Sequence, residues 1–305
     1  MRIPQKREKV FLMNVLTFDI EEWFHILDNQ STKTADSWQH YERRLDSNVD
    51  RILGLLYERN LKATFFCLGW VAREFPHVIG GIVERGHEVA THSDQHQLAY
   101  EQTPSEFRAD LDTSIKSLED VSGQKVRAYR APGFSVKKEN SWVFEELISA
   151  GIEVDCSIFP ANRSHGGFSG FGADTPSLVK TESGMIREFP INTTKLFGTN
   201  LIFSGGGYFR LLPEVLLKRY IKRSDYVMTY FHPRDFDPGQ PIIPGLSLAR
   251  RFKSYYGLRG AQKKLESLLD SYDFISLADA EQNIDWTNVP TVSIFKKPNL
   301  PMSLQ

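Results

Sequence analysis

The 305-residue sequence contains little of what would place it in several familiar classes. Its two cysteines, Cys67 and Cys156, are too few for a disulfide framework or a cysteine-rich zinc site. Both fall in apolar, strand-like runs, so we expect two buried small side chains rather than a redox pair. Charge of neither sign is in excess, because 37 Lys and Arg residues face 38 Asp and Glu residues. A nucleic-acid partner is therefore not expected, since duplex binding depends largely on a basic face.

Long apolar runs are missing as well, and none approaches the ~20 residues that a membrane-spanning helix needs. The segment 1–9 is basic, but the apolar run that follows it, residues 10–16, is short and contains Asn14. No small-residue cleavage site follows, so we read no signal peptide and expect a cytoplasmic location. Hydrophobic residues make up 41% and charged residues 25%, which is the balance of a soluble globular chain.

The chain instead contains a regular alternation of short β-rich runs and amphipathic stretches. Strands are expected over residues 10–20, 62–70, 87–93, 126–133, 152–160, 185–191, 226–233 and 274–278. Helices are expected over residues 47–60, 70–86, 103–123, 139–151, 211–225 and 260–272. Strand–helix repetition with crossovers of this length implies an α/β fold with parallel strands. Seven or more such runs predict a closed or nearly closed barrel.

Individual residues mark where several of these helices begin and end. Ser47 is the expected cap of the first helix, and Pro76 should break the second. The third helix has the clearest signals, because Thr103 can cap it, Pro104 suits its first turn and Gly123 can end it.

No linker divides the chain, so we expect one domain over residues 10–285, flanked by an extension, 1–9, and a C-terminal tail, 286–305. Two long segments break the strand–helix rhythm and are expected as insertions, at about 161–210 and 233–260. Loops of this length inside a compact domain are usually functional or mobile.

Four polar sets fall at the ends of predicted strands, where parallel barrels gather their catalytic side chains. The first is Asp19 with Glu21, which share one face of the strand because side chains alternate, while Glu22 points the other way. Two carboxylates on one face either bind a cation or raise the pKa of one of them. A pair of solvated acids in a strand-to-loop turn is the ordinary alternative.

The second set is His92 and His96, four residues apart in the run HSDQH. On a helical turn this spacing would place both imidazole rings on one side, where they suit a divalent metal. Two neutral imidazoles and a carboxylate oxygen would leave open positions for water and substrate, as in a catalytic site. His25 and His87 are expected to be surface or packing residues.

The third set is Arg130, whose guanidinium could hold a carboxylate by two parallel hydrogen bonds. The turn at Pro132 and Gly133 that follows could expose backbone N–H groups to an oxyanion. The fourth set is His232, which ends a late strand among apolar neighbours and suits acid catalysis. A strand-end salt bridge and a core histidine bonded to a backbone group are the ordinary alternatives for these two sets.

In chain order, the motifs TFDIEEW, HSDQH, RAPGF, DCSIFP and YFHP resemble those of the polysaccharide deacetylases of carbohydrate esterase family 4, the NodB-homology group. The resemblance covers about residues 14–280 and implies a distorted (β/α) barrel of about seven parallel strands. The runs FDIEEWFH, GGGYFR and FHPRDFDPGQP are most similar to a bacterial subgroup associated with exopolysaccharide or surface-glycan synthesis. That similarity also implies a cytoplasmic enzyme.

The resemblance implies a catalytic role for several of these residues. Asp19 would be the general base, and Arg130 would orient it. His232 would be the general acid. Asp155 stands where the family often has an acid that tunes this histidine.

For the cofactor, the resemblance implies one divalent metal ion bound by His92 and His96, with zinc expected and cobalt, nickel, manganese or iron as alternatives. The aspartate that also binds the metal in typical members is replaced by Ile20. Some relatives use an acid one position further on, which would make Glu21 the third ligand. Strand alternation favours Glu21 over Glu22, although a β-bulge could reverse the two.

The implied reaction is metal-assisted removal of an N-acetyl group from an amino sugar in a surface glycan, an exopolysaccharide or its lipid-linked precursor. The residues expected to contact this substrate are Trp23, Gly133, Phe134, Tyr208 and Tyr230. Between Pro241 and Leu265 no residue is acidic, and the basic ones are Arg250, Arg251, Lys253, Arg259, Lys263 and Lys264. This basic segment, 250–264, is either a solvated surface or a contact for an anionic part of the substrate or for inner-membrane headgroups.

Two further functions stay open. An amidase or deformylase on the same scaffold would act on a small C–N substrate. A glycan-binding protein with decayed catalytic motifs is the other, and Ile20 beside the base is the feature that keeps it open. A glycosidase that uses Glu21 and Glu22 as its acid pair is disfavoured, because neighbouring strand residues face opposite ways.

Overall fold

The computed structural model describes residues 13–294, except residue 28 and the ranges 162–165 and 197–198. The expected extension, 1–9, and the end of the expected tail lie outside the described residues. The strands are β1 (Met13–Val15), β2 (Thr17–Ile20), β3 (Thr64–Cys67), β4 (Glu88–Thr91), β5 (Ala128–Tyr129), β6 (Val154–Asp155), β7 (Ser177–Lys180), β8 (Met185–Glu188), β9 (Thr194–Leu196), β10 (Thr199–Leu201), β11 (Tyr226–Met228) and β12 (Thr291–Ser293).

The main sheet has the strand order β12-β7-β8-β6-β5-β4-β3-β2, and all pairings from β2 to β8 are parallel. β1 runs directly into β2 and pairs in parallel with β11, which extends the parallel arrangement beyond β2. The predicted α/β fold with a parallel sheet is therefore confirmed. β7 is antiparallel to β8, and β12, within the segment expected as a tail, pairs with β7.

The parallel strands curl around an apolar interior. Several strands contribute side chains to this interior cluster, among them Val15, Phe66, Ala90, Ala128 and Val154. Their strand neighbours, such as Phe65 and Val89, pack outward against the helices. No ladder of backbone hydrogen bonds joins β8 to β11 within the described ranges, so the barrel is not closed by strand pairing.

Two other hydrogen bonds span the gap between β8 and β11. The Tyr226 hydroxyl donates to the Pro190 carbonyl at 2.7 Å, and the Met228 amide donates to the Asn192 side chain at 3.1 Å. The result is a distorted barrel whose seam is bridged by side chains rather than by a continuous ladder.

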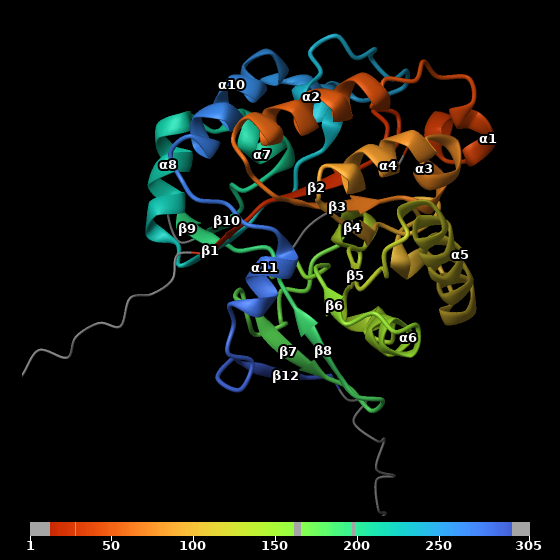
Figure 1. Cartoon of the computed structure of the whole chain (residues 1–305), viewed down its shortest axis with the longest axis vertical. Helices are drawn as coiled ribbons and strands as arrows, with labels where there is room; N and C mark the ends of the chain where they lie inside the picture. Colours follow the sequence, from red (N-terminus) through yellow and green to blue (C-terminus); the bar gives the residue numbers. More distant parts are fainter. Residues whose placement is uncertain (1–12, 28, 162–165, 197–198, 295–305) are drawn as a thin grey trace, which may run out of the picture.

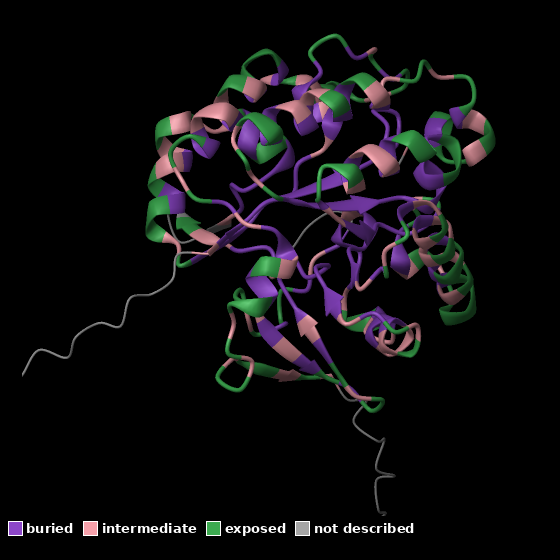
Figure 2. Ribbon diagram, in the orientation of Figure 1, coloured by how far each residue is buried: buried purple, intermediate pink, exposed green. Residues whose placement is uncertain are grey.

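The helices surround the strands, as Figure 1 shows for α2, α4, α5 and α6. They are α1 (Ala35–Trp38), α2 (Leu45–Glu58), α3 (Gly69–Glu74), α4 (Pro76–Glu84), α5 (Pro104–Ser122), α6 (Val143–Ser149), α7 (Gly206–Leu211), α8 (Glu214–Arg223), α9 (Leu248–Tyr255), α10 (Leu258–Leu269) and α11 (Leu277–Gln282). Short 3₁₀ turns lie at η1 (Gln30–Thr32), η2 (Ala99–Glu101), η3 (Pro132–Phe134), η4 (Lys138–Asn140) and η5 (Pro233–Phe236). The strands at the centre are buried, and the outer helix faces are exposed (Figure 2).

Most of the helix signals in the sequence are confirmed. Thr103 and Glu106 form a capping box at the start of α5, and Gly123 ends that helix in the left-handed conformation at φ 64°. Pro76 separates α3 from α4. Ser47, however, is not a cap, because α2 begins two residues earlier at Leu45.

The strand expected over residues 274–278 is also wrong. Only Ile275 makes a strand-like bridge, to Val15, and Leu277 already begins α11, with Ser276 as its cap. Cys67 and Cys156 are buried and form no disulfide, as expected. Among the described residues, no helix combines the length and the apolar character needed to cross a bilayer.

Candidate functional site

The four polar sets meet at the carboxyl ends of the parallel strands. Asp19 lies in β2, and His92 follows β4 directly. Arg130 follows β5, and His232 lies four residues beyond β11. A cavity of about 800 Å³ opens there, and Asp19, His92 and His232 are part of its lining. Residues more than 200 positions apart in the sequence therefore share one pocket.

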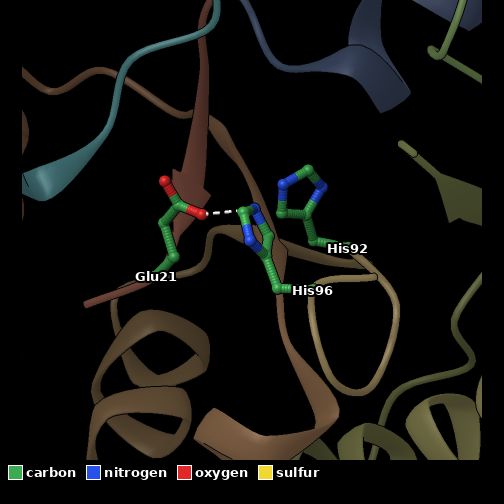
Figure 3. A group of neighbouring side chains, drawn as sticks. All are labelled: Glu21, His92 and His96. Carbon is green, nitrogen blue, oxygen red and sulfur yellow. Dashed lines mark ion pairs between the residues drawn. The ribbon is translucent and has the colours of Figure 1, made fainter. Parts of the chain in front are cut away.

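Glu21, His92 and His96 form a group that could hold a metal ion, because each offers one ligand atom and these atoms lie within 4.8 Å of one another. Figure 3 shows the carboxylate and the two rings facing a common space. Glu21 Oε2 forms an ion pair with His96 Nε2 at 2.6 Å, and no regular hydrogen bond satisfies this buried oxygen. Two imidazoles and one carboxylate are also the donor set of catalytic zinc sites.

The protonation states of His92 and Glu21 suit metal binding. His92 Nδ1 donates to the Arg130 carbonyl at 2.8 Å, which leaves the Nε2 lone pair free for a metal. Burial lowers the pKa of His92 to about 4, so the ring is neutral near pH 7. Burial by itself would raise the pKa of Glu21, but the neighbouring histidine charges, above all that of His96, hold it below its ordinary value.

The segment that carries the two histidines is a bent loop, not the helical turn considered from the spacing. Ser93 and His96 have φ angles of 74° and 54°, in the left-handed region that non-glycine residues rarely enter. Asp110 braces the bend, because its carboxylate accepts from the amides of Asp94 and Gln95 at 2.8 and 3.2 Å. Such local strain, held by surrounding bonds, is typical of functional sites.

The two glutamates after β2 have separate roles. Glu21 faces the cavity, whereas Glu22 points away and accepts hydrogen bonds from the backbone amides of Arg44 and Leu45, at 2.7 and 3.0 Å. These are unpaired donors at the start of α2, so Glu22 caps that helix from a distance. The structure thus brings Glu21, and not Glu22, to the histidine pair.

Arg130 lies behind the cavity and is completely buried. One of its nitrogens, Nη1, donates to Asp19 Oδ1 at 2.6 Å and to the Thr17 hydroxyl at 2.8 Å. The bond is therefore single rather than the two-fold fork that the sequence suggested. It still fixes the carboxylate, whose other oxygen lies 3.7 Å from His232 Nε2.

His232 is held by an acid that the sequence reasoning did not identify. Its Nδ1 donates to Asp235 Oδ2 at 3.0 Å, and Asp235 Oδ1 lies 2.9 Å from Arg210 Nε. Burial lowers the pKa of His232, but the bond to Asp235 and the charges of Glu21, Asp235 and Asp19 outweigh it and raise the pKa to about 9. The spacing HxxD in the run HPRD was the available signal.

Asp155 does not contact His232. It is fully buried at the end of β6, where it accepts from the Ser157 hydroxyl at 2.5 Å and bonds with Glu188. Burial, together with the charge of Asp155, raises the pKa of Glu188 well above its ordinary value. Ser157 in turn accepts from the Ala131 amide at 2.8 Å, so this buried pair supports the turn after Arg130.

Four of the five residues expected to contact substrate line the cavity: Gly133, Phe134, Tyr208 and Tyr230. Trp23 does not, because it is buried and its indole donates to the Glu42 carbonyl at 2.8 Å. His25, expected to be a packing or surface residue, does line the cavity. Its ring centroid lies 5.8 Å from that of His96.

The basic segment is divided between structural and exposed residues. Lys264 donates to three carbonyls at the end of α7, and Arg250 Nη2 donates to the Leu27 carbonyl. Arg250 and Lys253 line the cavity, together with the exposed rings of Phe252 and Tyr256. Only part of the segment is therefore available to a ligand.

Comparison with known families divides the chain into two matches. Residues 15–152 match the model of the polysaccharide deacetylases, and residues 156–281 match a domain of unknown function, DUF3473. The chain is 29% identical over 97 residues to a peptidoglycan-N-acetylglucosamine deacetylase of Bacillus cereus, covering 32% of this chain and 35% of that protein. It is 27% identical over 110 residues to a peptidoglycan deacetylase of Helicobacter pylori, covering 36% of each. The chain thus spans about a third of the length of these relatives.

The fold has a counterpart among solved structures. The crystal structure of a protein from Mycobacterium smegmatis named as a polysaccharide deacetylase superposes with a TM-score of 0.64 at 20% identity, covering 94% of this chain and 95% of that one. At this identity the likeness concerns the fold alone. The motifs, the strand-end site and the match over residues 15–152 agree, and the chain therefore carries a domain of the polysaccharide deacetylase family, carbohydrate esterase family 4.

Proposed function

We propose that this protein is a metal-dependent carbohydrate N-deacetylase that hydrolyses an N-acetyl group on an amino sugar of a glycan. The observation that carries the proposal is the convergence of Glu21, His92 and His96 beside Asp19 and His232 in one cavity. Each side chain then has a part in amide hydrolysis that its contacts support.

Glu21, His92 and His96 would hold one divalent ion, for which zinc suits two imidazoles and a carboxylate best. When bound, this ion supplies a Lewis acid beside the amide carbonyl. Cobalt, nickel, manganese and iron accept similar donors. The buried Glu21 oxygen without a hydrogen-bond partner and the free Nε2 of His92 are the features that fit an ion here.

Asp19 acts as the general base and accepts a proton from the attacking water. Arg130 holds its Oδ1, which leaves Oδ2 facing His232 across the site. His232 acts as the general acid and donates its proton from Nε2 to the leaving amine, which cannot depart as an anion. The raised pKa of His232 keeps that proton in place near pH 7.

We also propose one domain over residues 10–285, with insertions at about 161–210 and 233–260. Backbone pairing between the two matched regions supports this, because Phe18 of β2, in the first region, forms a parallel bridge with Phe231 of the second. A role in exopolysaccharide synthesis, a lipid-linked precursor as substrate and a cytoplasmic location stay predictions.

Contact of the basic segment with acidic headgroups at the inner membrane is a further part of the proposal. α9 has no buried residue, and Leu248 and Phe252 are 85% and 53% exposed beside the cations of the same helix. Charge reversal at the exposed Arg251 should reduce sedimentation with anionic vesicles at low salt, whereas unchanged sedimentation would remove the membrane contact from the proposal.

The reaction itself is tested by measuring the acid released from N-acetylated glycans, such as chitin oligomers and peptidoglycan fragments, by the metal-loaded protein. Acetate release that Asp19→Asn abolishes is expected. Release of formate or ammonia from small amides instead would favour the amidase or deformylase alternative. Glycan binding without any hydrolysis by the metal-loaded protein would favour a decayed enzyme.

A further inference from the structure

The catalytic cavity contains a cation whose charge has no partner. Arg234 lies in η5, two residues after the general acid His232, and its side chain lines the cavity. Its Nη2 is buried without a hydrogen-bond partner. Across the part of the chain that the structure describes, no carboxylate forms an ion pair with its guanidinium.

Arg210 and the carboxylates of the cavity are already engaged. Arg210 donates to the carbonyls of Ser254, Tyr256 and Lys253 and pairs with Asp235. Of the carboxylates, Asp19 is held by Arg130, and Glu21 faces the histidines. None of these acids is left to neutralise Arg234.

The side chain of Arg234 packs beside an aromatic ring at the wall of the cavity. Its guanidinium carbon lies 5.8 Å from the centroid of the Tyr255 ring, whose hydroxyl accepts from the Ile243 amide at 2.9 Å. Burial lowers the pKa of Arg234, and the negative charge of Asp235, followed by that of Glu21, acts against this effect. A guanidinium stays protonated near pH 7 even so.

From this geometry we infer that Arg234 forms an anion subsite within the catalytic cavity, so the glycan substrate carries a carboxylate or phosphate group close to its acetamido group. A guanidinium fork binds either anion through two parallel hydrogen bonds, and a partly desolvated site strengthens them. Lys253, which lines the same cavity, adds positive charge on the side of α9. The inference rests on the proposed function and names its substrate class: an acidic, N-acetylated glycan rather than a neutral one.

The kinetic test compares two substrates of equal length, a neutral chitin oligomer and an oligomer in which N-acetylglucosamine alternates with glucuronate. Arg234→Gln should raise KM for the acidic oligomer about 10- to 100-fold with little change in kcat, because a charged hydrogen-bond pair is lost from ground-state and transition-state binding alike. For Arg234→Lys, KM for the acidic oligomer should lie between the values of Arg234→Gln and the wild type. Arg219→Gln, which removes an exposed charge from α8 outside the cavity, is the matched control and should change KM for neither substrate.

Equal loss on both oligomers, or no loss on either, would overturn the anion subsite. Calorimetric titration of the metal-loaded protein with glucuronate, glucose 1-phosphate and glucose provides a readout that does not need turnover. The wild type should bind one of the two anions at least about tenfold more tightly than glucose. Tighter binding of glucuronate would indicate a carboxylate on the substrate, and tighter binding of glucose 1-phosphate would indicate a phosphate. Binding that survives Arg234→Gln would show that the anion sits elsewhere. If no substrate releases acetate, the proposed function fails while this titration still decides the subsite.

Discussion

Asp235 Oδ2 accepts a hydrogen bond from His232 Nδ1 at 3.0 Å, and this bond sets the protonation state of the general acid. The same carboxylate reaches back to the His232 amide, so backbone and side chain are held together in one short turn. His232 Nε2 is then left 3.7 Å from Asp19 and 3.6 Å from Glu21. The acid and the base of the proposed reaction therefore face each other across the site.

The pH dependence of the reaction should follow this pair. A general acid must be protonated, so activity should fall as pH rises through the His232 pKa of about 9. Asp235→Asn removes one negative charge and weakens the bond from His232 Nδ1, so the alkaline limb of the kcat/KM profile should shift down toward the ordinary value of 6.5. A bound cation would lower the pKa of His232 in the wild type and in Asp235→Asn alike, and the wild type would still have the higher value.

Asp155→Asn is the control for that profile, because Asp155 bonds to Ser157 and Glu188 instead of to His232. Its alkaline limb should coincide with that of the wild type. A limb that moves in Asp155→Asn and stays in place in Asp235→Asn would reverse the assignment of the partner acid.

Asp19→Asn should affect both catalysis and stability. Loss of the general base should lower kcat by about 100-fold or more. The substitution also leaves the fully buried Arg130 without its counter-charge, which should cost about 3–5 kcal/mol of unfolding free energy in chemical denaturation.

The double variant Asp19→Asn with Arg130→Met separates these two effects. It should recover much of the unfolding free energy, because the buried charge is gone, and none of the activity. If Asp19→Asn is as stable as the wild type, the ion pair does not have the structural importance that its burial implies.

Lys264 should contribute to stability rather than to ligand binding. Its ammonium donates to the carbonyls of Phe209, Arg210 and Leu212, which fastens α10 to the end of α7. Lys264→Met should lower the free energy of unfolding by about 1–3 kcal/mol, because buried carbonyls lose their donor. The neighbouring Lys263 is exposed, and Lys263→Met should change it by less than about 0.5 kcal/mol. Equal effects of the two substitutions would rule out the fastening role.

The parallel strands and most helix ends were predictable because their signals are local. Thr103, Pro104 and Gly123 act within one or two turns of α5, and the sequence contains everything those contacts need. The cap of α2 was not predictable in this way, because it comes from Glu22, which is separated from the helix by a long loop. Ser47 matches the local capping pattern, but the amides at the start of α2 donate to the distant Glu22 carboxylate instead.

The site was predictable where strand order brings motifs together. The alternation of β2, continued past its end at Ile20, separates Glu21 from Glu22, and the carboxyl ends of adjacent strands must meet at one edge of the sheet. Which acid holds His232 depends on how the chain turns after β11, and that turn places Asp235 beside Nδ1 of the ring. Periodicity carries no information about such a turn, and the family resemblance points to Asp155, which the structure places against Ser157 instead.

The central claim is that Glu21 and the two histidines hold one divalent ion on which hydrolysis depends. Its most direct test is the metal content of purified wild type, Glu21→Gln and Glu22→Gln, measured together with acetate release. We predict one ion per chain in the wild type and in Glu22→Gln, whose altered residue caps α2, and loss of both metal and activity in Glu21→Gln. Full metal content in Glu21→Gln, or full activity of a metal-free wild type, would contradict the account.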